Sequence, residues 1–393
     1  MKLSDRIRYV GVRDFRPILF ENQWPIPEGI SYNSYLIIDE KIALIDTVES
    51  AFTEEFFSNI NKEIGERGVD YLIVNHMEPD HSASVSAVRK RYPECAIVTN
   101  AKALPMLEGY QGVTDGVLVV KEGETLSLGE STLSFHMIPM VHWPETMVTY
   151  YLEEKTAFTG DAFGSFKAAP LCVSDSKTDL FEEYEAEMRR YYASIVGKYG
   201  SPVQSAIKKL GSLEINRICS THGPVWEREI AKVLDLYIML SSYKALSHGV
   251  CLAYASMYGN TRKAAKALAA ELDKRGIPYG IHDLCAENLS FALADAFKYD
   301  TIVIGAPTYN NGIFPAAKHF VEAICDRCLK NRSFAAFGSY TWAGTSVKKL
   351  NEIAAAQGFA ILGEGISFRQ GFDMARADMS SIASLVETSA GTR

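Results

Sequence analysis

The chain has 393 residues, 47% of them hydrophobic and 22% charged, which is ordinary for a globular protein with room for two domains. Its net charge is −8 and no basic stripe runs along it, which argues against a nucleic-acid partner. The N-terminal residues lack the apolar core of a signal peptide, and no apolar run approaches the roughly 18 residues of a membrane span.

The first part of the chain reads as short strands separated by helices. Its strand-like segments are rich in β-branched and aromatic residues, and turn-forming residues separate them. Helices are expected over 51–67 and 82–91. The expected strands are 32–39, 41–47, 70–76, 95–100, 125–129, 132–140, 146–152 and 217–223.

After about residue 248 the pattern changes to a plain alternation of strand and helix. Alternation of this kind predicts a parallel, doubly wound sheet. The expected strands are 249–256 and 299–307, and the expected helices are 261–275 and 315–329.

We therefore expect an α/β and α+β protein of two domains, residues 1–248 and residues 249–393. The second domain holds 15 basic and 13 acidic residues, a balance of +2. The remaining 25 basic and 35 acidic residues give the first domain a balance of −10.

The motif His-Met-Glu-Pro-Asp-His directly follows a buried-type apolar strand. Alternate residues of an extended segment point the same way, so His76, Glu78 and Asp80 are expected to converge. Pro79 biases Glu78 towards extended angles, and His81 is expected to begin the next helix.

Three more candidate ligands, His142, Asp161 and His222, each end or follow a strand-like run. A single histidine or aspartate in such a place is usually structural, and His136 is expected on an exposed strand face. Taken together, four histidines and three carboxylates divide naturally between two metal ions, with one carboxylate bridging them.

The order and spacing of these residues resemble the metallo-β-lactamase superfamily, which implies an αββα sandwich for the first domain. Hydrolases of that superfamily normally have histidine where this chain has Glu78. A carboxylate there favours iron or manganese over zinc, and it is the pattern of the flavodiiron proteins. The resemblance implies that one iron is bound by His76, Glu78 and His142, the other by Asp80, His81 and His222, with Asp161 bridging.

The same resemblance implies a tyrosine near the irons. In Arg-Arg-Tyr-Tyr-Ala-Ser-Ile the candidates are Tyr191 and Tyr192, and we take Tyr192 as the residue that lies behind the ligands.

In the second domain, three polar loops follow strand-like runs. A hydroxyl-rich loop at a helix N-terminus holds a phosphate through backbone N–H groups, and ligands of open α/β sheets bind at the carboxyl ends of strands. The loops resemble those of flavodoxin, which implies FMN, with Tyr309 and Trp342 placed to pack on the flavin. The candidate FMN-binding residues are Ser256, Met257, Tyr258, Gly259, Asn260, Thr261, Pro307, Thr308, Tyr309, Asn310, Asn311, Gly312, Ser339, Tyr340, Thr341, Trp342, Ala343 and Gly344.

The combined resemblance implies a flavodiiron oxidoreductase that reduces dioxygen to water, nitric oxide to nitrous oxide, or both. No rubredoxin-like cysteine pairs follow the second domain, so an external donor is expected: rubredoxin, another redox protein or a reduced deazaflavin coenzyme. Relatives in this family imply a head-to-tail homodimer, or a tetramer built from it.

Two rival interpretations remain open at this point. One is a zinc hydrolase with a flavodoxin appendage, which Glu78 disfavours. The other is an FMN electron carrier with an inactive lactamase-like scaffold, which the complete ligand set disfavours.

Seven scattered cysteines indicate reduced thiols and a cytoplasmic protein. The pair Cys325 and Cys328 is expected to be structural, with both side chains facing one core.

Overall fold

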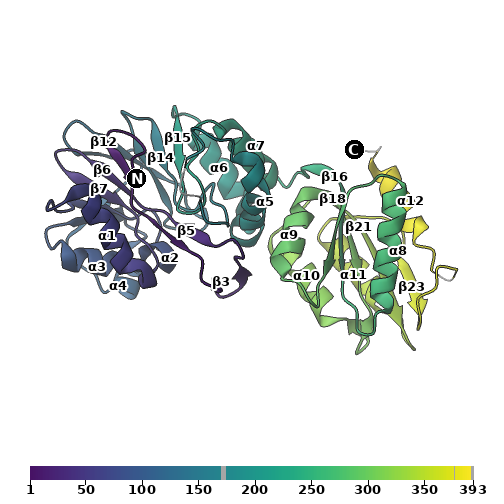
Figure 1. Ribbon diagram of the computed structural model, residues 1–393. Helices are drawn as coiled ribbons and strands as arrows, with labels where there is room; N and C mark the ends of the chain where they lie inside the picture. Colours follow the sequence, from purple (N-terminus) through teal and green to yellow (C-terminus); the bar gives the residue numbers. More distant parts are fainter. Residues whose placement is uncertain (170–173, 376, 391–393) are drawn as a thin grey trace. The chain divides into compact units, whose positions relative to one another are not determined.

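A computed structural model of the protein describes residues 1–169, 174–375 and 377–390 (Figure 1). Contacts divide the chain into two compact units. Unit 1 comprises Met1–Tyr191 and Ser201–Ile238, and unit 2 comprises Tyr192–Gly200 and Met239–Arg393. The boundary between the units thus falls about ten residues before the predicted one at residue 248. The earlier segment Tyr192–Gly200 also belongs to unit 2.

Unit 1 is a sandwich of two β-sheets with helices outside them, as predicted. The first sheet has the order β1 (Ile7–Tyr9), β6 (Tyr35–Ile38), β7 (Ile42–Ile45), β8 (Tyr71–Ile73), β9 (Ala96–Asn100) and β10 (Val117–Val120). The second has the order β11 (Thr125–Ser127), β12 (Thr132–Met137), β13 (Met147–Tyr151), β14 (Thr156–Phe158) and β15 (Arg217–Cys219). Two small ribbons complete it: β2 (Val12–Asp14) with β5 (Ile30–Tyr32), and β3 (Leu19–Phe20) with β4 (Trp24–Pro25).

The core of unit 1 lies between its two sheets. Ile45 and Ile73 from the first sheet belong to one buried cluster with Leu133 and Phe135 from the second. Leu133 and Phe135 are two residues apart on β12, so their side chains point to the same face. This packed core holds the ends of β8, β14 and β15, where the candidate ligands begin.

Helices cover the sandwich. Figure 1 shows α1, α3 and α4 grouped beside β6 and β7, and α5, α6 and α7 grouped beside β14 and β15. The predicted helix over 51–67 is a short turn, η1 (Ser50–Phe52), followed by α1, which ends where Gly65 takes a positive φ of 61°. The bounds are α1 (Thr53–Ile64), α2 (Pro79–Ser82), α3 (Val85–Arg91), α4 (Leu104–Gln111), α5 (Phe181–Tyr191), η2 (Tyr192–Val196), η3 (Gly197–Tyr199), α6 (Gly200–Leu210) and α7 (Ile230–Ser241).

Unit 2 is the predicted doubly wound parallel sheet. Its order is β17 (Tyr279–Asp283), β16 (Ser247–Tyr254), β18 (Tyr299–Gly305), β21 (Ser333–Tyr340) and β22 (Ala360–Ile361), and β23 (Ile366–Arg369) also pairs with β21. The second strand in the chain lies outside the first, which is the flavodoxin order. Its helices are α8 (Asn260–Lys274), α9 (Leu289–Lys298), α10 (Pro315–Asp326), α11 (Ser346–Ala356) and α12 (Ser380–Ala390), and a small hairpin joins β19 (Thr308–Tyr309) to β20 (Gly312–Ile313).

One expectation about unit 2 is wrong. Cys325 and Cys328 were expected to face one core, but Cys325 is half-buried and Cys328 is exposed. The reason is that α10 ends at Asp326, and Cys328 takes a positive φ of 54° beyond it. The described cysteines are all free thiols.

None of the described helices has the length and hydropathy that a membrane crossing requires.

Candidate metal centre and cofactor pocket

The motif of residues 76–81 leaves β8 as an extended segment and turns into a helix. Glu78 is extended, with φ −62° and ψ 134°, and α2 begins at Pro79. The helix therefore starts two residues earlier than expected, because proline suits the first helical position, where its missing N–H costs nothing. As a result, Asp80, which was expected on the extended segment, lies with His81 on the first helical turn.

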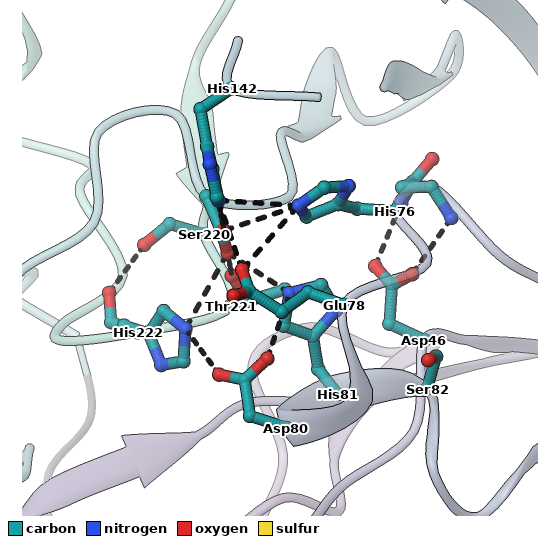
Figure 2. A network of polar contacts seen from close by, with 12 residues as sticks. Asp46, His76, Glu78, Asp80, His81, Ser82, His142, Ser220, Thr221 and His222 are labelled. Atoms are coloured by element: carbon teal, nitrogen blue, oxygen red, sulfur yellow. Dashed lines mark hydrogen bonds and ion pairs between the residues drawn. The ribbon is translucent and has the colours of Figure 1, made fainter. Parts of the chain in front are cut away.

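The structure brings all seven candidate ligands together, and Figure 2 shows His76, Glu78, Asp80, His81, His142 and His222 turned toward one another. His142 comes from the loop after β12, Asp161 from the loop after β14, and His222 from the loop after β15. All are buried except Asp80, which is partly buried.

One half of the cluster contains His76, Glu78 and His142. His142 Nε2 lies 2.9 Å from Glu78 Oε2 and 3.0 Å from Asp161 Oδ2. His76 Nε2 lies 3.6 Å from each of these two oxygens. Two imidazole nitrogens and two carboxylate oxygens therefore surround one point.

The other half contains Asp80, His81 and His222. His222 Nε2 lies 3.1 Å from Asp80 Oδ2 and 3.4 Å from Asp161 Oδ1. His81 Nε2 lies 3.2 Å from Asp161 Oδ1 and 3.4 Å from Asp80 Oδ1. Asp161 thus presents one oxygen to each half, which is the arrangement that a bridging carboxylate requires.

The polar atoms of this cluster fit cations. Both Asp80 oxygens, both His81 nitrogens and His222 Nε2 are buried, and none makes a hydrogen bond to the described residues. Burial lowers the pKa of His81 and His222, but neighbouring carboxylates outweigh it and raise these values to about 9 and about 10. Buried polar atoms without hydrogen bonds need an explanation, and a metal ion that displaces the histidine protons supplies one.

Outer contacts hold several of these side chains. His76 Nδ1 lies 2.7 Å from Glu145 Oε1, and His222 Nδ1 lies 2.9 Å from the backbone oxygen of Ser31. The Thr221 hydroxyl donates to Asp161 Oδ1 at 2.5 Å. None of these three contacts was predicted from the sequence, although Glu145 is a carboxylate three residues after a candidate ligand.

Of the two tyrosines, the structure brings Tyr191 rather than Tyr192 to the cluster. The Tyr191 ring centroid is 5.6 Å from that of His222. Tyr192 belongs to unit 2 and packs on Phe297, with centroids 5.9 Å apart. Adjacent helical residues point in directions about 100° apart, so only one of the pair can face the ligands.

A surface pocket of about 440 Å³ opens onto the cluster. Glu78 and Asp80 lie in its wall, and Leu19, Phe20 and Glu21 border it from the β3–β4 hairpin. A small molecule therefore has a route from the surface to the carboxylates of both halves.

Unit 2 has a separate pocket of about 320 Å³ at the carboxyl ends of its strands. The predicted FMN-binding residues line it, except the glycines Gly259, Gly312 and Gly344. Gln370, which was not predicted from the sequence, also lines it, because β23 brings it beside Tyr340. Its backbone N–H donates to the Tyr340 oxygen at 2.7 Å.

Local structure explains how these loops form. Asn310 and Asn311 connect β19 to β20 and both have positive φ, 48° and 54°, as a tight two-residue hairpin requires. The Ser256 hydroxyl accepts the N–H groups of Gly259 and Arg262 at 3.1 and 3.3 Å and so shapes the turn into α8. Trp342 is 80% exposed at the rim, where a flat ring can stack on it.

Both units match known protein families. Residues 30–223 match the ODP family beta lactamase, and residues 252–381 match flavodoxin. The anaerobic nitric oxide reductase flavorubredoxin of Pectobacterium atrosepticum is 31% identical over 91% of this chain and 71% of its own length. Rubredoxin oxygen:oxidoreductase from Desulfovibrio gigas is 29% identical, with a TM-score of 0.92 over 100% of this chain and 98% of its own. A flavo di-iron protein mutant from Thermotoga maritima is 28% identical, with a TM-score of 0.88 over 98% and 96% of the two chains.

Proposed function

This chain belongs to the flavodiiron protein family, and from that premise we propose that it is an oxidoreductase that reduces dioxygen to water, nitric oxide to nitrous oxide, or both. Two iron ions and FMN are its cofactors. The observation that carries the proposal is the Asp161 carboxylate, whose oxygens divide between two histidine pairs.

In this function His76, Glu78 and His142 hold one iron, Asp80, His81 and His222 hold the other, and Asp161 bridges them. Once bound, the iron pair supplies electrons and open positions for a diatomic gas, and FMN relays electrons from a donor. The chain itself fixes the ligands: Thr221 holds one Asp161 oxygen, and Glu145 and the Ser31 carbonyl orient two imidazoles. Phe20 and Tyr191 pack against His222 and keep bulk water from that side.

The pocket of unit 2 would hold FMN in this proposal: the Ser256–Thr261 turn would bind its phosphate, and the polar loops with Trp342 would bind its flavin ring. Electrons come from an external donor: rubredoxin, another redox protein or a reduced deazaflavin coenzyme. The protein works as a head-to-tail homodimer, or a tetramer built from it, in which FMN of one chain serves the irons of its partner. We place this chemistry in the cytoplasm, where thiols stay reduced.

The test is direct. Purified protein should contain about two irons and one FMN per chain, by analogy with paired-metal sites and flavodoxin pockets. Reduced protein should then be mixed without air with dioxygen or nitric oxide in parallel, and gas consumption followed. Tightly bound zinc, no iron after anaerobic reconstitution, and ester hydrolysis would contradict the proposal.

A further inference from the structure

The two halves of the metal cluster differ in what stands behind their histidines. His76 turns Nε2 to the cluster and Nδ1 to the carboxylate of Glu145, at 2.7 Å. His222 turns Nε2 to the cluster and Nδ1 to a backbone carbonyl, at 2.9 Å. One histidine therefore donates to a charged acceptor and the other to a neutral one.

Glu145 is rigidly placed for this contact. Its side chain is only 1% exposed, and the oxygen that faces His76 also accepts the Met77 N–H at 3.0 Å. Its backbone oxygen accepts the Asn100 side chain at 2.5 Å, which ties the loop to the end of β9. The carboxylate cannot turn away without leaving two N–H donors unpaired.

Glu145 also makes the charge of the two halves unequal. Each half has one carboxylate of its own, Glu78 or Asp80, and both share Asp161. Asp46 is buried nearby, but its two oxygens accept the backbone and side-chain N–H groups of Asn75 at 2.8 and 2.9 Å. Glu21 also lies close to Glu78, in the wall of the surface pocket. Among the described carboxylates outside the seven candidate ligands, Glu145 is the one that accepts a hydrogen bond from one of their histidines.

We propose that Glu145 is a positioning residue that makes the two irons unequal: it holds the His76 proton on Nδ1 and lowers the reduction potential of the ion at His76, Glu78 and His142. An N–H···carboxylate contact raises the basicity of a ligating imidazole, and a nearby negative charge favours the more positive ferric ion. The inference rests on the proposed function and deepens it, because it names the iron that is harder to reduce.

Two substitutions separate the hydrogen bond from the charge. Glu145→Gln has the same shape and keeps an oxygen that accepts the His76 N–H, but it carries no charge. Glu145→Ala removes both. Asp175→Asn is the matched control, because Asp175 is a buried carboxylate of unit 1 that accepts the N–H groups of Glu227 and Glu229 at 2.7 and 2.9 Å.

The measurements are iron per chain and the two one-electron potentials, from redox titrations followed by electron paramagnetic resonance and Mössbauer spectroscopy. Glu145→Gln should keep both irons, raise one potential and leave the other unchanged. Glu145→Ala should weaken metal binding at one site by about 10–100-fold, as other losses of outer contacts do. Asp175→Asn should change neither quantity.

Double variants identify the affected ion. His222→Ala weakens the site of Asp80, His81 and His222, so in that background Glu145→Gln should shift the reduction potential of the iron that remains at the His76 site. His142→Ala weakens the His76 site instead, so in that background Glu145→Gln should not shift the potential of the iron that remains. Wild-type potentials for both ions in Glu145→Gln would overturn the inference, as would an effect only in the His142→Ala background. If Glu145→Ala does not fold, the isosteric Glu145→Gln still tests the inference by itself. An unaltered protein without an iron pair would instead contradict the proposed function itself.

Discussion

At the scale of single residues, the metal cluster combines ligands from one short motif, residues 76–81, with ligands from distant parts of the sequence. The six-residue motif is local, and its two histidines and two carboxylates reach both halves because Pro79 ends the extended segment and starts a helix. Asp161, in contrast, arrives from a separate strand and contacts four histidines. It is the residue on which the two halves depend in common.

We therefore expect Asp161→Ala to be the most damaging single ligand change. Without the bridge, two cations lie close together with less anion between them, so iron affinity should fall by more than about 100-fold, beyond the loss that outer contacts cause. Asp161→Asn keeps one good oxygen donor and should retain more iron than Asp161→Ala. Iron analysis after desalting checks this; two bound irons and normal turnover in Asp161→Ala would show that the bridge assignment is wrong.

Glu78→His tests the metal preference of the site. The change removes one negative charge and replaces oxygen by imidazole, so zinc should compete better with iron. Competition between equal concentrations of the two metals, read by metal analysis of wild type and variant, should show a higher ratio of zinc to iron in the variant. Unchanged iron occupancy and gas reduction would show that Glu78 does not bind metal.

That the seven candidate ligands would lie together was predictable, because four belong to one short motif after an apolar run and the other three end or follow similar runs. Their outer contacts were harder to predict. The contact of Glu145 with His76 spans 69 residues of sequence, and the Ser31 contact uses a backbone oxygen that no residue type encodes. The choice of Tyr192 over Tyr191 was wrong, because it depends on how α5 is rotated against its neighbours.

At the scale of elements, buried strands were easier to predict than exposed or short ones. β7 and β8 appear within the expected segments, and α8 lies within one residue of its prediction. The segments of β10 and β17 were not predicted, and β14 was indicated only as a strand-like run before Asp161. β14 has only three residues, and the half-buried and exposed residues of β17 do not mark it as a sheet strand. Strand pairing, not local sequence, defines them.

β17 also carries His282, whose positive charge stabilises the fold through two neighbouring carboxylates. His282 lies between Glu287 and Asp295, at 2.7 and 3.0 Å. Burial lowers its pKa, but these carboxylates outweigh it and raise the pKa to about 9. Because the folded value exceeds the unfolded one of about 6.5, the stabilisation is complete below pH 6.5 and is lost as pH rises through 9. It amounts to roughly 1–3 kcal/mol after allowance for partly exposed partners.

The expected outcome is a thermal midpoint of unit 2 that falls between pH 7 and pH 10 more in wild type than in His282→Gln. Flavin fluorescence reports this transition. The comparison with the variant removes the contribution of lysines and tyrosines that titrate in the same range. Equal pH dependence in both proteins would show that His282 is not charged in the folded state.

At the scale of the whole molecule, the sequence indicated two units correctly but not how the chain divides between them. Composition marks a change near residue 248, where the strand–helix alternation starts. The contacts place Tyr192–Gly200 with unit 2 as well, because Arg327 donates to the backbone oxygens of Ala193 and Ser194 at 2.5 and 3.1 Å. The assignment of this short segment to unit 2 depends on tertiary contacts, so it could not be predicted from the amino-acid composition.

The proposed head-to-tail dimer makes a quantitative prediction for the whole molecule. A metal-deficient chain, His142→Ala with His222→Ala, is co-expressed with an FMN-deficient chain altered at Ser256, Asn260 and Thr261. Each parent alone should be inactive. In a mixed dimer, the intact flavin of one chain faces the intact iron site of the other at one of the two interfaces.

Random assortment of a two-fold dimer makes about half of the molecules mixed, and half of the sites in each mixed dimer are competent. About a quarter of the normal activity should therefore return. The proportion of mixed dimers is measured with two affinity tags, and gas consumption is measured on the doubly purified fraction, which should reach about half of normal activity. Confirmed mixed dimers that are as inactive as their parents would mean that electrons pass within one chain, and the head-to-tail arrangement would then have no role in turnover.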